Sequence, residues 1–157
     1  MTAQVDVQFA VDDSTLPTVG DIAFWVDQAM LAAERSGDAE VSVRVVDAAE
    51  MRQLNSDFRE QDKSTNVLSF PAGQIEGLPA DAKQPLGDIV ICAAVVSDEA
   101  SQQGKALSDH WAHMIVHGTL HLLGFDHVED FDATEMEGLE ARILVGQGLA
   151  NPYGESP

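Results

Sequence analysis

Four short apolar runs constrain the fold of this chain more than any other feature of its sequence. Residues 5–11 and 41–45 alternate apolar and polar side chains, the period of two that is typical of a strand with one buried face. Residues 67–70 form a third run that ends at Pro71, and residues 86–91 form a fourth that is almost entirely apolar in its second half. A continuously apolar strand is usually covered on both faces, so we expect the fourth strand inside the sheet.

Segments with helical periodicity separate these runs. The longest helix is expected over residues 108–123, with Ser108 as its N-cap and Gly124 as the residue that stops it. Asp47 opens a second helix with the spacing of a capping box, and Asp132 opens the last one, to about residue 144, in the same way. The other two helices are expected over residues 19–35 and 93–103.

These elements predict a single α+β domain of α/β-like character, with one mostly four-stranded sheet backed by about five helices. A length of 157 residues is typical of one domain, and a hydrophobic content of 45% is enough to form a core. We expect the domain to cover residues 1–150 and residues 151–157 to form a flexible tail. No apolar run approaches the roughly 20 residues needed to cross a bilayer, so we expect no membrane association.

The single cysteine, Cys92, lies in an apolar run and is expected to be a small buried side chain. One cysteine cannot form an internal disulfide, which favours a reducing compartment. The N-terminal residues also lack the basic patch and the continuous apolar stretch of a secretory signal. We therefore expect a cytoplasmic protein.

Three histidines near the end of the longest predicted helix form a candidate metal site. His117 and His121 are four residues apart, so their side chains lie on the same helical face. Gly124 permits a sharp reversal of the chain, after which His127 can return as a third ligand. Three nitrogen ligands with one position left for water are typical of catalytic zinc. The sequence predicts one zinc ion per chain, although imidazole ligands also suit nickel, copper and iron.

Two further histidines, His110 and His113, belong to the same predicted helix. A set made of His113, His117 and His121 would extend over about 12 Å of helix axis, which is too long for three bonds of about 2 Å to one ion. We therefore favour a structural role for His110 and His113, and keep a role beside the metal or the substrate as the alternative.

The spacing His-x-x-x-His-x-x-Gly-x-x-His is also that of the metzincin proteases. Those enzymes place a glutamate directly after the first histidine as the general base. In this chain that position is Gly118, which can neither accept nor donate a proton. A zinc metallopeptidase-like hydrolase is therefore only a distant alternative.

Three blocks of this sequence closely resemble the YbeY family of bacterial endoribonucleases. The first is residues 117–127, which read His-Gly-Thr-Leu-His-Leu-Leu-Gly-Phe-Asp-His. The second joins residues 55–59, Asn-Ser-Asp-Phe-Arg, to residues 62–71, Asp-Lys-Ser-Thr-Asn-Val-Leu-Ser-Phe-Pro. The third is residues 86–89, Leu-Gly-Asp-Ile. The chain departs from the family at Asn66, where the family typically has aspartate.

The resemblance implies a metal-dependent, single-strand-specific endoribonuclease that acts in ribosomal RNA maturation and ribosome quality control. It implies that His117, His121 and His127 bind zinc and that Arg59 is essential, with Arg59, His117 and His121 as the catalytic set. An arginine fork can hold a phosphate through two hydrogen bonds and offset charge that develops in the transition state. The implied partners are ribosomal RNA and ribosomal or assembly proteins.

The net charge of −19 is the one property that opposes RNA binding. Arg52, Arg59 and Lys63 fall within twelve positions and can form a local cationic spot. Alternatively, they only balance the neighbouring acidic residues on a solvated face, Asp57, Glu60 and Asp62. The charge also keeps open the alternative that the protein is a ribosome-assembly factor. In that case the metal is mainly structural, and partner proteins supply the affinity for the ribosome.

Overall fold

A four-stranded mixed sheet forms the middle of the fold. The computed structural model describes residues 4–33, 39–72, 84–124, 130–149 and 151–153. The strands lie in the order β1-β2-β4-β3, with β1 parallel to β2, β2 parallel to β4, and β3 antiparallel to β4. The prediction that the fourth strand lies inside the sheet is confirmed. The strand bounds are Gln4–Phe9 for β1, Ala39–Val46 for β2, Val67–Pro71 for β3 and Gln84–Cys92 for β4.

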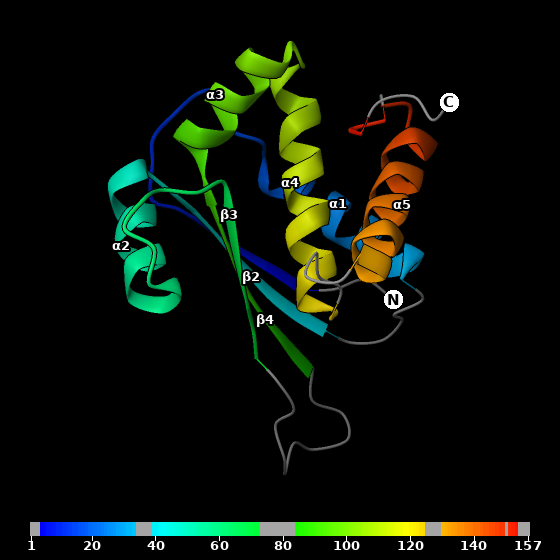
Figure 1. Cartoon of the computed structure of the whole chain (residues 1–157), viewed down its shortest axis with the longest axis horizontal. Helices are drawn as coiled ribbons and strands as arrows, with labels where there is room; N and C mark the ends of the chain where they lie inside the picture. The colour runs from blue at the N-terminus through cyan, green and yellow to red at the C-terminus, as the bar shows by residue number, and fades with distance from the viewer. Residues whose placement is uncertain (1–3, 34–38, 73–83, 125–129, 150, 154–157) are drawn as a thin grey trace.

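Helices cover the two faces of the sheet unequally. Figure 1 shows α2 on one side and α1, α4 and α5 on the other. Over the described residues the chain is one α+β domain with five helices, as the sequence predicts. None of these helices is both long and apolar enough to cross a membrane. The helix bounds are Val19–Ala32 for α1, Ala48–Arg59 for α2, Ala93–Gln103 for α3, Leu107–Leu122 for α4 and Asp130–Gly146 for α5.

Two apolar clusters form because successive strand residues point to opposite faces of the sheet. Val43 and Ile89 are register partners on β2 and β4, and both belong to the large core that also contains α1, α4 and α5. Val90 and Cys92 instead pack in the smaller cluster beneath α2. Cys92 is buried, as expected, and burial raises the pKa of its thiol.

Side-chain caps start α1 and α2. The Thr18 hydroxyl accepts a hydrogen bond from the Asp21 amide, and the Asp21 carboxylate accepts one from the Thr18 amide. The predicted cap at Asp47 is present, because its carboxylate accepts a hydrogen bond from the Glu50 amide at 2.8 Å. The second half of that capping box is replaced, since the Glu50 side chain binds the guanidinium of Arg44.

Two predicted helix starts are wrong. The N-cap of α4 is Ala106, which makes no capping side-chain bond, and Ser108 already lies in the first turn. The helix begins early because Leu107 packs against the large core, and core packing outweighs a cap preference of about 1 kcal/mol. Helix α5 begins at Asp130, so Asp132 lies within the helix and is not its N-cap.

Candidate metal centre

Helix α4 brings two of the predicted ligands together. The Nε2 atoms of His117 and His121 lie 3.1 Å apart, and both side chains keep partial access to solvent. Two nitrogen ligands of one tetrahedral zinc ion, each bonded at 2.0–2.1 Å, lie about 3.3 Å apart. The pair therefore has the spacing that one zinc ion requires.

The third predicted ligand, His127, lies outside the described residues. The residue that ends α4 is described. Gly124 follows the C-cap Leu123 and has a φ of 105°, so the predicted stop at this glycine is confirmed. Its positive φ turns the chain away from the helix axis directly after the two histidines.

A buried carboxylate from α5 contacts His117 from the side away from His121. Glu140 has an exposed fraction of 0%, and its Oε1 lies 2.5 Å from His117 Nδ1. Its second oxygen, Oε2, accepts a hydrogen bond from the Tyr153 hydroxyl and lies 3.5 Å from His113 Nε2. Burial by itself would raise the pKa of Glu140, but these contacts with His113, His117 and Tyr153 outweigh it and lower the pKa to about 2.

Potential ligand atoms of His113, His117 and Glu140 all lie within 4.8 Å of one another. This cluster and His121 supply the imidazole and carboxylate groups from which a hydrolytic metal centre is built. Sequence reasoning missed Glu140, although a signal was present: it lies on the apolar stripe of α5. The stripe consists of Met136, Leu139, Ile143 and Leu144, all buried.

His110 lies apart from this group, near the start of α4. Its Nε2 lies 2.9 Å from Oε1 of Glu99 on α3, and burial lowers the pKa of its imidazole against the effect of that carboxylate. The same carboxylate accepts hydrogen bonds from the Asn66 amide at 3.2 and 3.3 Å. An asparagine suits this contact, since an aspartate at position 66 would set two carboxylates against each other.

Gly118 faces the sheet, away from the histidines. A Cβ atom on it would lie 2.8 Å from Ile89 Cγ2, closer than Cβ atoms pack in proteins, and would make a tight contact of 3.2 Å with Val67 Cγ2. A glutamate at this position would therefore point between β3 and β4 and could not serve a metal held by His117. The close packing gives a physical reason for the missing metzincin glutamate.

Arg59, the last residue of α2, reaches the edge strand β3. Its Nη2 donates a hydrogen bond to the Ser69 carbonyl at 2.9 Å, and its guanidinium carbon lies 5.0 Å from the ring centroid of Phe70. The Ser69 hydroxyl in turn donates to the Gly118 carbonyl at 2.9 Å. Two hydrogen bonds thus connect Arg59 through β3 to the residue that follows His117.

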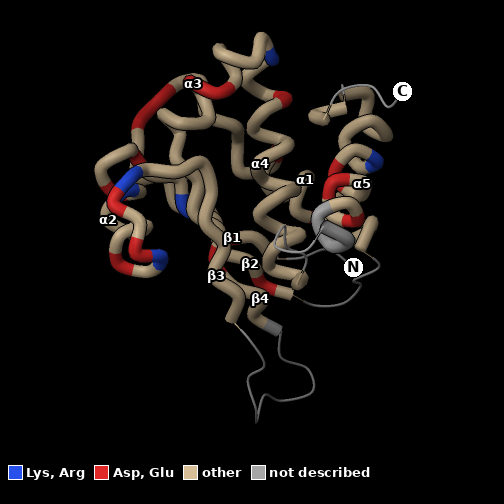
Figure 2. Tube along the Cα trace, in the orientation of Figure 1, with Lys and Arg blue, Asp and Glu red and all other residues tan. Residues whose placement is uncertain are grey.

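The charge of Arg59 is not neutralised by an ion pair within the described part of the chain. Figure 2 shows basic and acidic positions interspersed along α2 and the segment after it. Arg52 binds Asp62 through two hydrogen bonds, at 2.8 and 3.0 Å. The charge-balancing interpretation therefore holds for Arg52 and fails for Arg59, which remains available to an anion.

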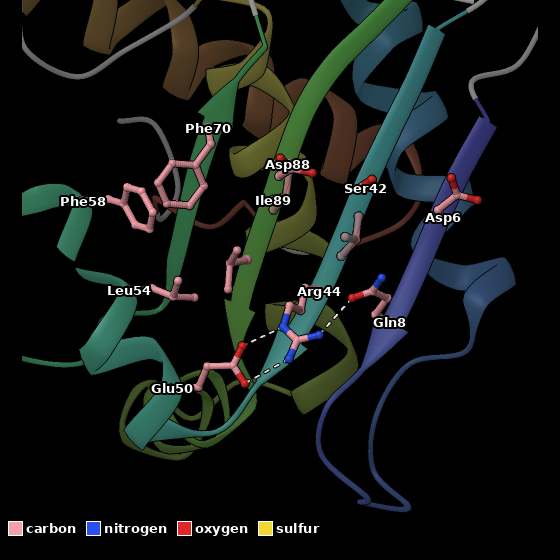
Figure 3. Close-up of a pocket in the computed structure, with 12 residues that line it drawn as sticks. Asp6, Gln8, Ser42, Arg44, Glu50, Leu54, Phe58, Phe70, Asp88 and Ile89 are labelled. Carbon is pink, nitrogen blue, oxygen red and sulfur yellow. Dashed lines mark hydrogen bonds and ion pairs between the residues drawn. The ribbon is translucent and has the colours of Figure 1, made fainter. Parts of the chain in front are cut away.

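A cavity of about 450 Å³ lies on the opposite face of the sheet, and the described residues that line it do not include the histidines. Figure 3 shows Phe58 and Phe70 at one end and Arg44 at the other, where Glu50 and Gln8 hold its guanidinium. Because this arginine is already paired, the lining residues offer no unpaired cation to a phosphate. Among the described residues, the clustered groups that could hold a metal ion lie instead on α4 and α5.

Comparison with protein families decides the class of this chain. A family model described as "Endoribonuclease YbeY" matches residues 17–147. The chain belongs to the YbeY family. Membership makes it an endoribonuclease, a metal-dependent hydrolase of RNA with a role in ribosomal RNA processing. The segment that matches the family model contains Arg59, His117, His121 and Glu140.

The fold has a counterpart among solved structures. The solution structure of TM1509 from Thermotoga maritima matches with a TM-score of 0.59 at 24% sequence identity. The match covers 98% of this chain and 97% of TM1509. The likeness shows that the two chains share a fold over nearly their whole lengths.

Proposed function

We propose that this YbeY-family protein is a zinc-dependent endoribonuclease that cleaves single-stranded RNA during ribosomal RNA maturation and ribosome quality control. One zinc ion per chain would be held by His117, His121 and His127. The observation that carries the proposal is the 3.1 Å separation of the Nε2 atoms of His117 and His121. The spacing of the third histidine, three residues beyond Gly124, supports it.

The donor set fits zinc, and the position of the pair fits catalysis. Imidazole nitrogens are common zinc ligands, and three of them leave a fourth position for water or substrate. His121 is only partly buried at the end of α4, so a phosphate can approach it. When bound, zinc supplies Lewis-acid stabilisation of the negative charge that develops on the scissile phosphate.

Arg59 would bind the phosphate of the RNA substrate. Its guanidinium is positioned by the Ser69 carbonyl and the Phe70 ring, and its other N–H groups can donate to phosphate oxygens. Arg59→Ala is expected to lower kcat/KM for RNA cleavage by about 10- to 100-fold, since hydrogen bonds to charged groups contribute about 1.5–3 kcal/mol. Initial rates on an unstructured oligoribonucleotide measure the effect, and zinc content should stay unchanged.

Arg52→Ala is the matched control for Arg59, because it removes the same charge from an exposed position of the same helix where Asp62 already pairs with it. Its cleavage rate should stay close to that of the wild type, since an exposed ion pair contributes only about 0.2–1 kcal/mol. Equal losses in the two variants would show that general charge, and not a phosphate contact at Arg59, determines the rate.

Removal of the metal tests the proposed function directly. Dialysis against a chelator is expected to abolish cleavage of single-stranded RNA, and one equivalent of zinc per chain is expected to restore it. A duplex RNA and an unstructured peptide serve as parallel substrates and should not be cleaved. RNA cleavage that persists in metal-free protein would contradict the proposal. Zinc-dependent cleavage of the peptide would instead support the alternative of a zinc metallopeptidase-like hydrolase.

The acidic surface requires a source of affinity for ribosomal particles. We infer that ribosomal or assembly proteins in the cytoplasm supply part of it, because the net charge of −19 repels polyanions. Co-sedimentation of Arg59→Ala with ribosomal particles separates the two roles. If the variant still sediments with ribosomal particles but no longer cleaves RNA, the enzyme is recruited by partner proteins. If it loses both properties, the affinity comes from contacts with the RNA itself.

A further inference from the structure

We propose that Glu140 is a positioning residue for the metal: its carboxylate holds His117 by Nδ1 so that Nε2 faces the ion shared with His121. Tyr153 and His113 would complete this support by fixing the second oxygen of Glu140. The inference rests on the proposed function, in that it assumes a metal bound to His117. It gives a role to Glu140 on α5 and to Tyr153 in the segment that follows this helix.

The contacts of Glu140 argue against direct ligation. Oε1 faces His117 Nδ1 at 2.5 Å, and Oε2 accepts the hydrogen bond from Tyr153, so each oxygen already has a partner. The two nitrogens of an imidazole point in divergent directions. An ion placed between the Nε2 atoms of His117 and His121 is therefore separated from Glu140 by the His117 ring, too far for a bond of about 2 Å.

The same contact sets the tautomer of His117. A neutral imidazole carries one N–H, and an ionised carboxylate can only accept a hydrogen bond, so the hydrogen lies on Nδ1. The lone pair is then on Nε2, which is the atom that meets His121. Metal-binding histidines usually donate their other N–H to such a group, and its loss typically weakens metal affinity by about 10- to 100-fold.

Burial makes Glu140 dependent on its partners. Glu140 is fully buried on the apolar stripe of α5, where an unpaired charge would be costly, and its partners come from two other segments. His113 belongs to α4, one turn before His117, and Tyr153 belongs to the segment after α5. His113 Nε2 also lies 3.3 Å from the Tyr153 hydroxyl, so the three groups restrain one another.

Two measurements on Glu140→Gln test the role. Competition titration with a chromophoric chelator should show zinc affinity about 10- to 100-fold below that of the wild type. Long-range ¹H–¹⁵N NMR of the metal-free protein should show His117 with its hydrogen on Nδ1 in the wild type and a mixture of tautomers in the variant. Tyr153→Phe, which removes one hydrogen bond and keeps the ring, should show a smaller loss of affinity in the same direction.

Glu135→Gln is the matched control, since it makes the same change of charge at an exposed position of α5. Thermal unfolding of each variant shows whether it folds. If Glu140→Gln does not fold, the zinc affinity of Tyr153→Phe alone tests the role. Wild-type affinity in both variants, or a wild-type His117 with its hydrogen on Nε2, would overturn the positioning role alone. A wild-type protein that binds no zinc would overturn the proposed function as well.

Discussion

Replacement of His121 by alanine is expected to abolish zinc binding and RNA cleavage together, with the fold retained. The variant removes one nitrogen of the pair whose Nε2 atoms lie 3.1 Å apart. Loss of a partner behind a ligand typically costs about 10- to 100-fold in affinity, so loss of the ligand itself should cost more than about 100-fold. His121 lies at the partly exposed end of α4, so its truncation should leave the core intact.

Zinc content after gel filtration, the rate of RNA cleavage and the far-ultraviolet circular dichroism spectrum measure the three parts of this expectation. His110→Gln serves as the control, because His110 contacts Glu99 and lies outside the pair. His113→Ala provides the contrast. If His121→Ala kept its zinc and His113→Ala lost it, the ion would lie in the cluster of His113, His117 and Glu140, and the proposed ligand set would be wrong.

Gly87→Ala is expected to cause the largest loss of stability of any conservative substitution considered in this protein. Gly87 has a φ of 139°, and a Cβ on it would lie 2.2 Å from the Phe70 carbonyl oxygen. That oxygen belongs to the backbone of β3, which is paired with β4, so it cannot move without disrupting the ladder. We expect a fall in the free energy of unfolding of about 4 kcal/mol or more, within the exceptional range for single substitutions.

Urea denaturation followed by tryptophan fluorescence measures this effect. Gly104→Ala separates steric conflict from backbone strain, because Gly104 also has a positive φ, 66°, but a Cβ added to it would meet nothing within 4 Å among the described residues. Its cost should be about 1–2 kcal/mol, that of the left-handed conformation alone. Equal losses for the two variants would mean that the contact with Phe70 is relieved easily and that the β3–β4 edge is more adaptable than its geometry indicates.

Features set by local geometry could be predicted from the sequence. The continuously apolar run at residues 89–91 predicted that β4 lies inside the sheet, and a separation of four residues on one helix was sufficient to bring His117 and His121 together. Helix starts were less predictable. Capping preferences are weak compared with core packing, so α4 begins at Leu107 instead of at the expected serine.

Contacts between distant elements could not be predicted in the same way. Glu140 lies 23 positions after His117, and Tyr153 a further 13 positions on, in the segment predicted as a tail. No local pattern states that α5 packs against α4 at this point. The carboxylate on an otherwise apolar helical stripe indicated only that a buried partner must exist. The contact of Asn66 with Glu99 likewise joins residues 33 positions apart.

The burial of α4 has a consequence for how the protein acquires its metal. This helix is covered along most of its length, and Gly118 presses directly against β3 and β4, so the scaffold of the histidine pair is formed by the apolar core. Zinc fingers are the opposite case, because their chains need the ion in order to fold. Here the apoprotein should retain its native shape, and loading should be a local, reversible event that can follow the supply of metal without unfolding and refolding of the chain.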